Sequence, residues 1–382
     1  MPATNSVQTP SQLELGPAAG TVTFGVEEEF LLLDPLIGWP VPVAPALLRL
    51  LRDHSGPRAE LMRYQFETAT AVCTNTGQLR RELVRLRTLA ASGARSMGCR
   101  LIASGTAPFG AHGLSALSAG PRYRAMALRH PTLTAISGVC GCHVHVGVPS
   151  RDLGVRVLAR LRPWLATLLA ISANSPIAGA RDTGWASHRY EVHSQWPTAR
   201  APEVWRDAIE YDQAVQQFLR RGAAIDERSV YLLARLSPRC PTVEVRVADT
   251  CPDIDTTMLV ATLVRALVTA AVTEIHAGVP PVPALRPWVV DGLLAAARNG
   301  LDGLGVDPFT GHTTPAWDLV ARLLDQVGKA LAQLGDTATV DSLLARLRER
   351  GTGAARQRRL WISTASVPEV VAGLAAMTDA TH

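Results

Sequence analysis

Three consecutive glutamates inside an apolar segment place the strongest constraint on how this chain can fold. Residues 25–30 read GVEEEF and are followed by leucines, so a strand is predicted over residues 21–33. Side chains of a strand alternate between its faces, which puts Glu27 and Glu29 on one face and Glu28 with its apolar neighbours on the other. Two carboxylates on one face repel each other and lose hydration when buried, so a bound cation would stabilise them. An exposed acidic edge is the alternative.

A second segment carries two histidines in the same alternating pattern. Residues 139–148 are predicted to form a strand in which Gly141, His143, His145 and Gly147 share one face while Cys140, Cys142, Val144 and Val146 share the other. The cysteines would then be core thiols, because they point away from the histidines and cannot complete a zinc cluster with them. Two histidines on one face, flanked by small glycines, leave room for a ligand. A hydrogen-bonded core histidine is the alternative for either one alone.

Two further segments contribute charged side chains of the same kind. Residues 241–248 alternate valines with Glu244 and Arg246, which predicts a strand with one apolar and one charged face. Taken alone, this pattern is also typical of a surface Glu/Arg pair. Glu67 lies in the β-like stretch 64–70 and is a candidate for a further ligand, with an isolated strand glutamate as the alternative.

Together these segments predict one sheet with an apolar face toward helices and a polar face that binds ligands. The polar face carries Glu27, Glu29, His143, His145, Glu244 and Arg246. Oxygen ligands dominate, so the face favours Mg²⁺ or Mn²⁺ over zinc and predicts a platform for metal and nucleotide. The chain has one lysine, Lys329, and no Walker A loop surrounds it, so arginines, metal and backbone would have to hold any bound phosphates.

The remaining sequence predicts long helices between these strands. Helices are expected over 78–98, 151–173, 202–221 and 253–277, then in shorter pieces from 286 onward, broken at 300–311, 335 and 351, with another strand over 101–104. This order predicts an α+β fold with a mostly antiparallel sheet and helices packed on its outer face. We expect a disordered tail over 1–20, a single catalytic domain over 21–366, and a C-terminal helix and tail over 367–382.

Composition argues against several classes of partner. The net charge of +5 comes from 38 basic and 33 acidic residues that are scattered along the chain, which argues against nucleic acid as a partner. Six cysteines without a Cys-x-x-Cys pair are typical of reduced thiols in the cytoplasm. No signal-peptide pattern is found, and the longest apolar stretch, 258–272, carries Arg265, so no membrane partner is expected.

Many short motifs in a fixed order extend from about residue 21 to residue 359. They are TFGVEEEF at 23–30, the Glu67 segment, GTAPF at 105–109, GCHVHVG at 141–147, ANSP at 173–176, residues 182–189, WPT at 196–198, and residues 242–249, 296–303 and 353–358. In these motifs the chain resembles the carboxylate–amine ligase family, also called glutamate–cysteine ligase type 2, of the glutamine-synthetase-like superfamily. The resemblance implies a funnel-like antiparallel sheet that binds ATP with Mg²⁺ or Mn²⁺ at its centre.

The same resemblance implies roles for individual residues. The metal shell would consist of Glu27, Glu29, Glu67, His143 and Glu244. Arg246 would face the transferred phosphoryl group, and His145 and Arg356 would lie at the nucleotide. Arg189 and Arg298 would hold substrate and phosphate.

The implied chemistry is amide formation in two steps. A carboxylate, glutamate's γ-carboxylate in the type reaction, takes the γ-phosphoryl group of ATP, and an amine such as that of cysteine displaces the phosphate from the acyl phosphate. This requires positioning and charge neutralisation and a lid against water, for which 178–184 and 351–358 are candidates. The expected partners are small carboxylates and amines, with a homodimer as the assembly.

Departures from the family pattern leave the substrates open. Arg200 stands where a glycine is usual, and His188 where a tyrosine or alanine is common. Residues 231–233, which read YLL, stand where an aromatic–aspartate pair often precedes Ala-Arg. A ligase with another acid or a specialised amine is therefore an alternative. A metal-dependent hydrolase and a non-catalytic nucleotide- or glutamate-binding relative are the others.

Overall fold

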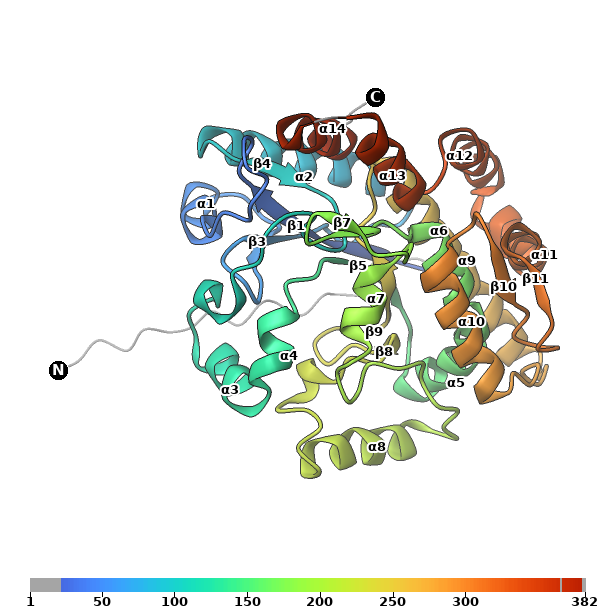
Figure 1. Ribbon diagram of the computed structural model, residues 1–382. Coiled ribbons are helices and arrows are strands. Elements are labelled where there is room, and N and C mark those ends of the chain that lie inside the picture. Colours follow the sequence, from blue (N-terminus) through green and yellow to red (C-terminus); the bar gives the residue numbers. More distant parts are fainter. Residues whose placement is uncertain (1–21, 365, 380–382) are drawn as a thin grey trace.

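An antiparallel sheet with helices packed against one face organises the structure (Figure 1). In the computed structural model, which describes residues 22–364 and 366–379, the strand order is β2-β3-β1-β5-β9-β8, and β4 also pairs with β1. The strands are β1 (Phe24–Leu33), β2 (Pro57–Ala59), β3 (Gln65–Ala69), β4 (Arg100–Ile102), β5 (Gly141–Gly147), β8 (Ala234–Leu236) and β9 (Thr242–Asp249). Every pairing in this sheet is antiparallel, which confirms the α+β class. The expected tail over 1–20 lies outside the described residues.

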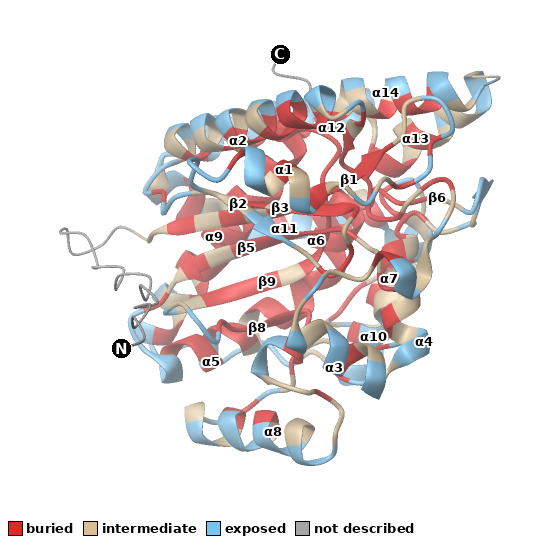
Figure 2. Ribbon diagram, turned by 90° about the vertical axis from the view of Figure 1, so that its left-hand side faces the viewer, coloured by how far each residue is buried: buried red, intermediate tan, exposed pale blue. Residues whose placement is uncertain are grey.

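The apolar face of the sheet forms the main core. Val26, Val144 and Val245 are buried in one cluster with side chains of α5 (Arg151–Leu161), α6 (Leu165–Ser172) and α9 (Ile254–His276). Helix α9 is long and apolar enough to cross a membrane by length and composition, but 78% of its apolar window is buried inside the protein. Figure 2 shows this helix and the neighbouring strands mostly in the buried colour. The helix therefore serves as the centre of a folded core.

Helix α2 (Thr76–Ser96) brings an arginine into this core. The side chain of Arg87 is 1% exposed and pairs with that of Glu28, also 1% exposed, at 2.6 Å. The guanidinium also donates to the carbonyls of Cys251 (2.9 Å) and Thr378 (3.2 Å). This buried pair neutralises the middle glutamate of β1, the one on the apolar face.

Two predicted helices differ from the observed ones at a proline. The segment 151–173 is interrupted after α5 by a 3-10 turn, Arg162–Trp164, because Pro163 has no amide hydrogen to donate. The helix predicted from Pro202 begins later, as α8 (Ala208–Arg220), where Asp207 accepts a hydrogen bond from the amide of Glu210 at 2.8 Å. An acidic N-cap thus determines this start, and the proline lies outside the helix.

The C-terminal third is helical, as predicted, apart from a short hairpin that the sequence did not indicate. The hairpin pairs β10 (Leu304–Val306) with β11 (Thr313–Pro315) between α10 (Arg286–Asn299) and α11 (Ala316–Leu334), and α12 (Thr337–Arg350) and α13 (Gly353–Ser363) follow. Helix α14 (Val367–Asp379) packs against β4 and α2. There the Thr378 hydroxyl accepts a hydrogen bond from the amide of Ala103 at 2.8 Å.

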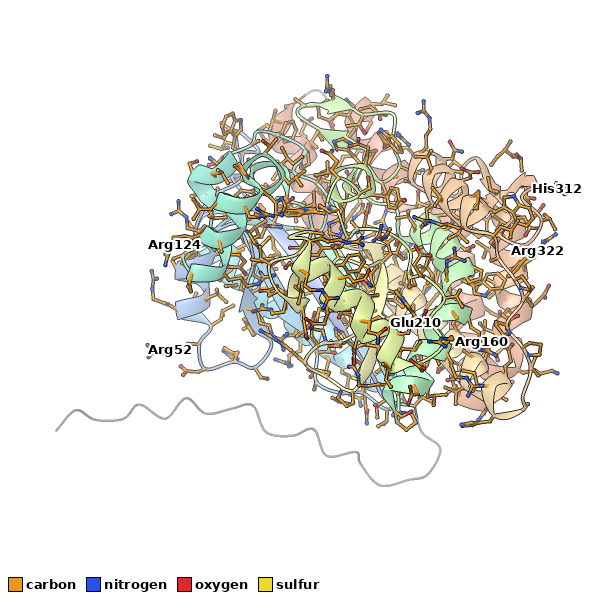
Figure 3. All side chains as sticks on the ribbon, turned by 90° about the horizontal axis from the view of Figure 1, so that it is seen from below. Arg52, Arg124, Arg160, Glu210, His312 and Arg322 are labelled. Carbon is orange, nitrogen blue, oxygen red and sulfur yellow. The ribbon has the colours of Figure 1, made fainter. Side chains whose placement is uncertain are left out.

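Smaller elements surround the polar face of the sheet and its edges. They are α1 (Ala44–Leu50), α3 (Pro121–Arg129), α4 (Pro131–Ile136), β6 (Ile177–Ala178), β7 (Arg181–Asp182) and α7 (His188–His193). Figure 3 labels arginines from well-separated segments, among them Arg52, Arg124 and Arg322, at separate places around the edge of the molecule. This agrees with basic residues that are scattered along the chain.

Candidate active site

Strand register brings the predicted polar residues together on one face. Glu27 of β1 is paired with His143 of β5, and His145 of β5 is paired with Glu244 of β9. On the other side of β1, Glu29 is paired with Glu67 of β3. Carboxylates and histidines from four adjacent strands thus line one surface, as strand alternation predicted.

Three of these residues form a group with the geometry of a cation site. Ligand atoms of Glu27, His145 and Glu244 all lie within 4.8 Å of one another. The Nδ1 atom of His145 is 2.9 Å from the Thr242 hydroxyl, whereas its Nε2 atom is buried without a hydrogen-bond partner among the described residues and lies 3.5 Å from a Glu27 oxygen. A histidine fixed through one nitrogen with the other free beside carboxylates fits a metal ligand.

His143 lies between the two glutamates of β1. Its Nδ1 is 3.6 Å from a Glu27 oxygen and its Nε2 is 3.7 Å from a Glu29 oxygen. Burial, together with the nearby Arg246 guanidinium, lowers the pKa of His143 to about 4. The ring is therefore neutral at physiological pH, which is the form that binds metal ions.

The carboxylates on this face are crowded enough to disturb one another's ionisation. Burial and the neighbouring charges of Glu27, Glu60 and Glu29 raise the pKa of Glu67 well above its ordinary value. Burial raises the pKa of Glu29 as well, although Arg189 and the Gly141 amide oppose that effect. A divalent cation would relieve this repulsion, so the donor set fits Mg²⁺ or Mn²⁺.

Arginines hold three of the carboxylates on this face. Arg58 of β2 lies 2.7 Å from a Glu27 oxygen and 3.5 Å from a Glu67 oxygen, with its own side chain half exposed. Glu244 is held by Arg235 at 2.9 Å and also contacts Arg246. Burial raises the pKa of Glu244, but these two arginines outweigh burial and lower the pKa below its ordinary value.

Arg189 reaches the same face from helix α7 through a buried network. Asp249, at the end of β9, lies 3.8 Å from the Arg189 guanidinium and accepts hydrogen bonds from the hydroxyls of Ser175 and Ser187, both at 2.7 Å. The guanidinium also donates to the carbonyls of Val247 and Arg246. Asp249 thus ties the loop before α7 to the sheet and positions Arg189.

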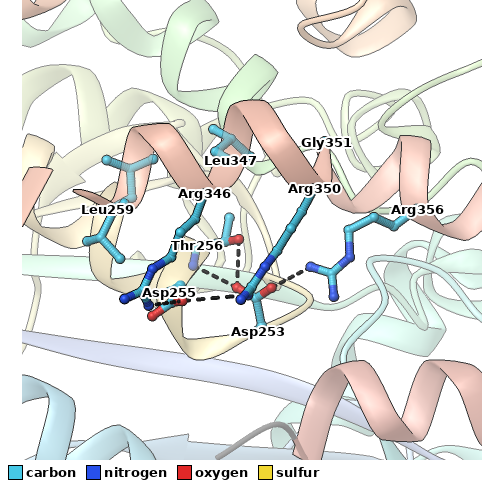
Figure 4. A pocket seen from close by; sticks show the side chains of 10 residues that line it. Asp253, Asp255, Thr256, Leu259, Arg346, Leu347, Arg350, Gly351 and Arg356 are labelled. Carbon is cyan, nitrogen blue, oxygen red and sulfur yellow. Dashed lines mark hydrogen bonds and ion pairs between the residues drawn. The ribbon is translucent and has the colours of Figure 1, made fainter. Parts of the chain in front are cut away.

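The structure places two other predicted residues away from this face. The Arg298 guanidinium stacks over the Trp185 ring, 5.8 Å from its centroid. Arg356 pairs with Asp253, the N-cap of α9, in a small pocket that also contains Asp255, Arg346 and Arg350 (Figure 4). Neither arginine lines the cavity beside the carboxylates, so their predicted roles remain predictions.

A cavity opens beside the polar face and encloses about 490 Å³, part of it open to solvent. Glu29, His143 and Arg246 line it from the sheet, and Arg189 lines it from α7. The rest of its wall is more apolar and aromatic, and comes from Glu60, Leu61, Arg122, Tyr123, Met126, Ser137, Val139, His193, Trp196 and Tyr231. The cavity can therefore hold a small molecule that has one end at Arg246.

Several residues at the site were not found by sequence reasoning. Arg58 and Glu60 lie on either side of Ala59, shortly before the Glu67 strand, and their opposite charges were the only available signal. Arg235 lies in β8, whose apolar residues are too few to show a strand period. Arg122 opens a short helix in a stretch that no motif covers.

The two cysteines beside the histidines, Cys140 and Cys142, are core thiols, as predicted. Cys142 is buried among the apolar side chains between sheet and helices. Cys140 precedes β5 and packs in a different cluster, with Leu31 and Met62. The predicted common face for the two cysteines was therefore wrong, because strand alternation does not extend to a residue before the strand.

The two segments proposed as lids contact each other. Arg358 of α13 lies 2.8 Å from Asp182 of β7, and Gln357 donates to the side chain and the carbonyl of Asn174, both at 2.8 Å. The β6–β7 turn and the start of α13 thus form one continuous structure.

The chain matches a family model over nearly its whole length. The model for glutamate–cysteine ligase family 2 covers residues 23–372. A protein of Salinispora tropica named "Putative glutamate--cysteine ligase 2" is 44% identical over 95% of this chain and 96% of its own. A protein of Mycolicibacterium smegmatis named "Putative glutamate--cysteine ligase 2-3" is 41% identical over 94% of this chain and 98% of its own.

Solved structures of low sequence identity share the fold. A glutamate–cysteine ligase from Francisella tularensis in complex with AMP has a TM-score of 0.69 at 13% identity, covering 95% of this chain and 90% of its own. A bifunctional glutathione synthetase from Pasteurella multocida has a TM-score of 0.66 at 15% identity, covering 94% of this chain and 51% of its own.

Proposed function

The chain belongs to glutamate–cysteine ligase family 2, and from that premise we propose that it joins a small carboxylate to an amine at the expense of ATP, through an acyl phosphate. The type reaction, transfer of a γ-glutamyl group from glutamate to cysteine, is the first candidate. Another acid or amine in the same chemistry is the second, because Arg200, Leu232 and His188 depart from the family pattern near the substrate loops.

The observation that carries the proposal is the set of carboxylates and histidines on one sheet face beside a cavity. Glu27, His145 and Glu244 converge, and Glu29, Glu67 and His143 lie next to them by strand register. We propose that these residues hold Mg²⁺ or Mn²⁺. The bound ions would neutralise the phosphates of ATP and so reduce the repulsion between two anions.

The chain's own residues then have separable roles. Arg246 lies at the junction of the carboxylates and the cavity, where it would stabilise negative charge on the transferred phosphoryl group. Arg189, held by Asp249, would orient the carboxylate that attacks. His145 would face the nucleotide side of the metal group. A protein nucleophile is not required, because the substrate carboxylate supplies the attacking oxygen.

We propose that Arg298 and Arg356 approach the phosphates only when substrates are bound, that the protein acts in the cytoplasm, and that it forms a homodimer. Small molecules, and neither nucleic acid nor membrane, would be its partners. Residues 21–366 would form the catalytic domain.

Turnover with defined substrates tests the proposal. Purified protein is incubated with ATP, Mg²⁺ and glutamate against a panel of amines that includes cysteine, while ADP is followed by a coupled assay and products by mass spectrometry. We expect amine-dependent ADP release together with a γ-glutamyl amide. Phosphate release without any amine requirement would favour a hydrolase. Binding of ATP without turnover, across other carboxylates as well, would favour the non-catalytic relative.

A further inference from the structure

An arginine at the edge of the sheet lies between two of the carboxylates proposed to bind metal. Strand β2 is the edge strand, and its Arg58 is paired by register with Glu67 of β3, so both side chains lie on the polar face. One guanidinium nitrogen, Nη1, lies 3.5 Å from a Glu67 oxygen and 2.7 Å from a Glu27 oxygen. Its positive charge therefore bridges carboxylates of two adjacent strands, as a metal ion in that position would.

The two carboxylate oxygens of Glu27 face different partners. Oε1 contacts Arg58, whereas Oε2 lies 3.5 Å from Nε2 of His145 and 3.6 Å from Nδ1 of His143. An ion beside His145 can therefore bind through Oε2 and leave Arg58 in place. An ion that binds Oε1 together with Glu67 would have to lie where the guanidinium lies, because Mg²⁺ approaches its oxygen ligands to about 2.1 Å.

Arg58 is free to leave its carboxylates, in contrast to the arginine that holds Glu244. Arg235 is 8% exposed and also donates to the carbonyls of Arg228 at 3.1 Å and Val230 at 2.8 Å. The Arg58 side chain is 50% exposed, and within residues 22–364 and 366–379 its hydrogen bonds go to Glu27 and Glu67 alone. A half-exposed ion pair is weak, so Arg58 can be displaced without disturbing the fold.

We propose that Arg58 is an intramolecular counter-ion that occupies the cation position between Glu27 and Glu67, and that a divalent ion binds there by displacing it. The inference rests on the proposed metal-binding role of this face and concerns the order in which the face is filled. The guanidinium offsets the repulsion between the carboxylates, and it lowers their affinity for a divalent ion, which must break the pair and approach a positive charge. The group of Glu27, His145 and Glu244 would then bind its ion first.

Manganese binding without nucleotide tests the assignment. Mn²⁺ is titrated into the metal-free full-length chain, bound ions are counted by equilibrium dialysis with free Mn²⁺ measured by electron paramagnetic resonance, and thermal unfolding is recorded at each concentration. Arg58→Met should bind the weakest ion at least about tenfold more tightly, or bind one more ion per chain over the same range of concentration. Mn²⁺ should also raise the Tm of this variant by more than that of the parent protein.

Three further variants control for the charge, the loss of an arginine and the position of the ion. Arg58→Lys keeps the positive charge and should bind Mn²⁺ as the parent protein does. Arg151→Met removes a similarly exposed arginine, 52% exposed and paired with Asp212 of α8, and should leave Mn²⁺ binding unchanged. Adding Glu67→Gln to Arg58→Met removes one carboxylate of the position and should abolish the gain.

Two results would overturn the assignment. Unchanged Mn²⁺ binding in Arg58→Met would show that Arg58 does not compete with the ion, and weaker binding would show that it orients Glu27 for the ion instead. A gain that persists after Glu67→Gln would place the additional ion elsewhere. If circular dichroism shows that Arg58→Met is misfolded, Arg58→Gln, which removes the charge but keeps a polar side chain, should show the same gain.

The titration separates this inference from the proposed function. A parent protein that joins a carboxylate to an amine and binds Mn²⁺, beside an Arg58→Met protein that binds Mn²⁺ no more tightly, contradicts the inference alone. A parent protein that releases no ADP with any acid and amine, beside an Arg58→Met protein that gains Mn²⁺, contradicts the ligase and supports the counter-ion.

Discussion

Replacing Arg87 by methionine should destabilise the protein strongly, because its guanidinium is buried in the core. The change removes both hydrogen bonds to Glu28, at 2.6 and 3.1 Å, and leaves that carboxylate buried with the Thr257 hydroxyl at 2.7 Å as its remaining side-chain donor. Breaking a buried ion pair on one side costs about 3–5 kcal/mol. Unfolding entropy of about 0.8 kcal/mol per kelvin, scaled to 382 residues, converts this loss to a decrease in Tm of about 4–6 °C.

The assay is thermal and urea-induced unfolding of three variants beside the parent. Arg81→Met, at an exposed position of the same helix, controls for loss of an arginine and should change the free energy of unfolding by less than about 0.5 kcal/mol. Adding Glu28→Gln to Arg87→Met removes the stranded charge and should recover about half of the loss, since the carbonyls of Cys251 and Thr378 still lack their donor. An Arg87→Met protein as stable as Arg81→Met would refute the reasoning.

Three further changes test the site, the core and the acid response. Glu29→Gln should abolish ATP turnover with an unchanged circular dichroism spectrum, because it removes a proposed ligand charge at constant volume; retained turnover would contradict the metal assignment. Cys142→Ser should lower the free energy of unfolding by about 1–3 kcal/mol and leave bound divalent metal, measured by equilibrium dialysis, unaffected; metal loss would show that the thiol is a ligand. Burial raises the pKa of Asp253, but Arg356 outweighs burial and lowers this pKa in the folded state. The ionised Asp253 therefore stabilises the folded state at neutral pH, and this stabilisation is lost as the pH falls below about 4. Asp253→Asn should therefore lower the urea midpoint at pH 7 and flatten its decline toward pH 3; an unchanged acid decline would argue against this pair.

Strand alternation was the most informative part of the sequence because it is a local property. It placed Glu27 and Glu29 together, apart from Glu28, and it placed His143 and His145 on the same face. Register between strands depends on neighbours far along the chain, so the sequence alone could not show that His145, rather than His143, closes the tightest group with Glu27 and Glu244. The family resemblance predicts that Arg356 lies at the nucleotide, whereas in the structure it pairs with Asp253, the N-cap of α9.

Residues outside periodic segments escaped prediction for a different reason. Glu60 lies between two short strands, where neither alternation nor helical spacing applies, and only the fold places it in the cavity wall. The N-cap Asp207 and the interruption at Pro163, by contrast, are local signals that the sequence carries.

The contacts of Thr378 have a consequence for when this part of the core can be completed during synthesis. Arg87 and Thr378 are 291 residues apart in the sequence. The hydroxyl of the same threonine also accepts a hydrogen bond from the amide of Ala103. During synthesis the strand with the three glutamates and the helix that neutralises its middle one emerge early, while the last partner of both Arg87 and Ala103 emerges near the end. The Arg87 guanidinium and the Ala103 amide therefore lack one hydrogen-bond acceptor each until Thr378 has been synthesised. This part of the core can be completed only late in translation.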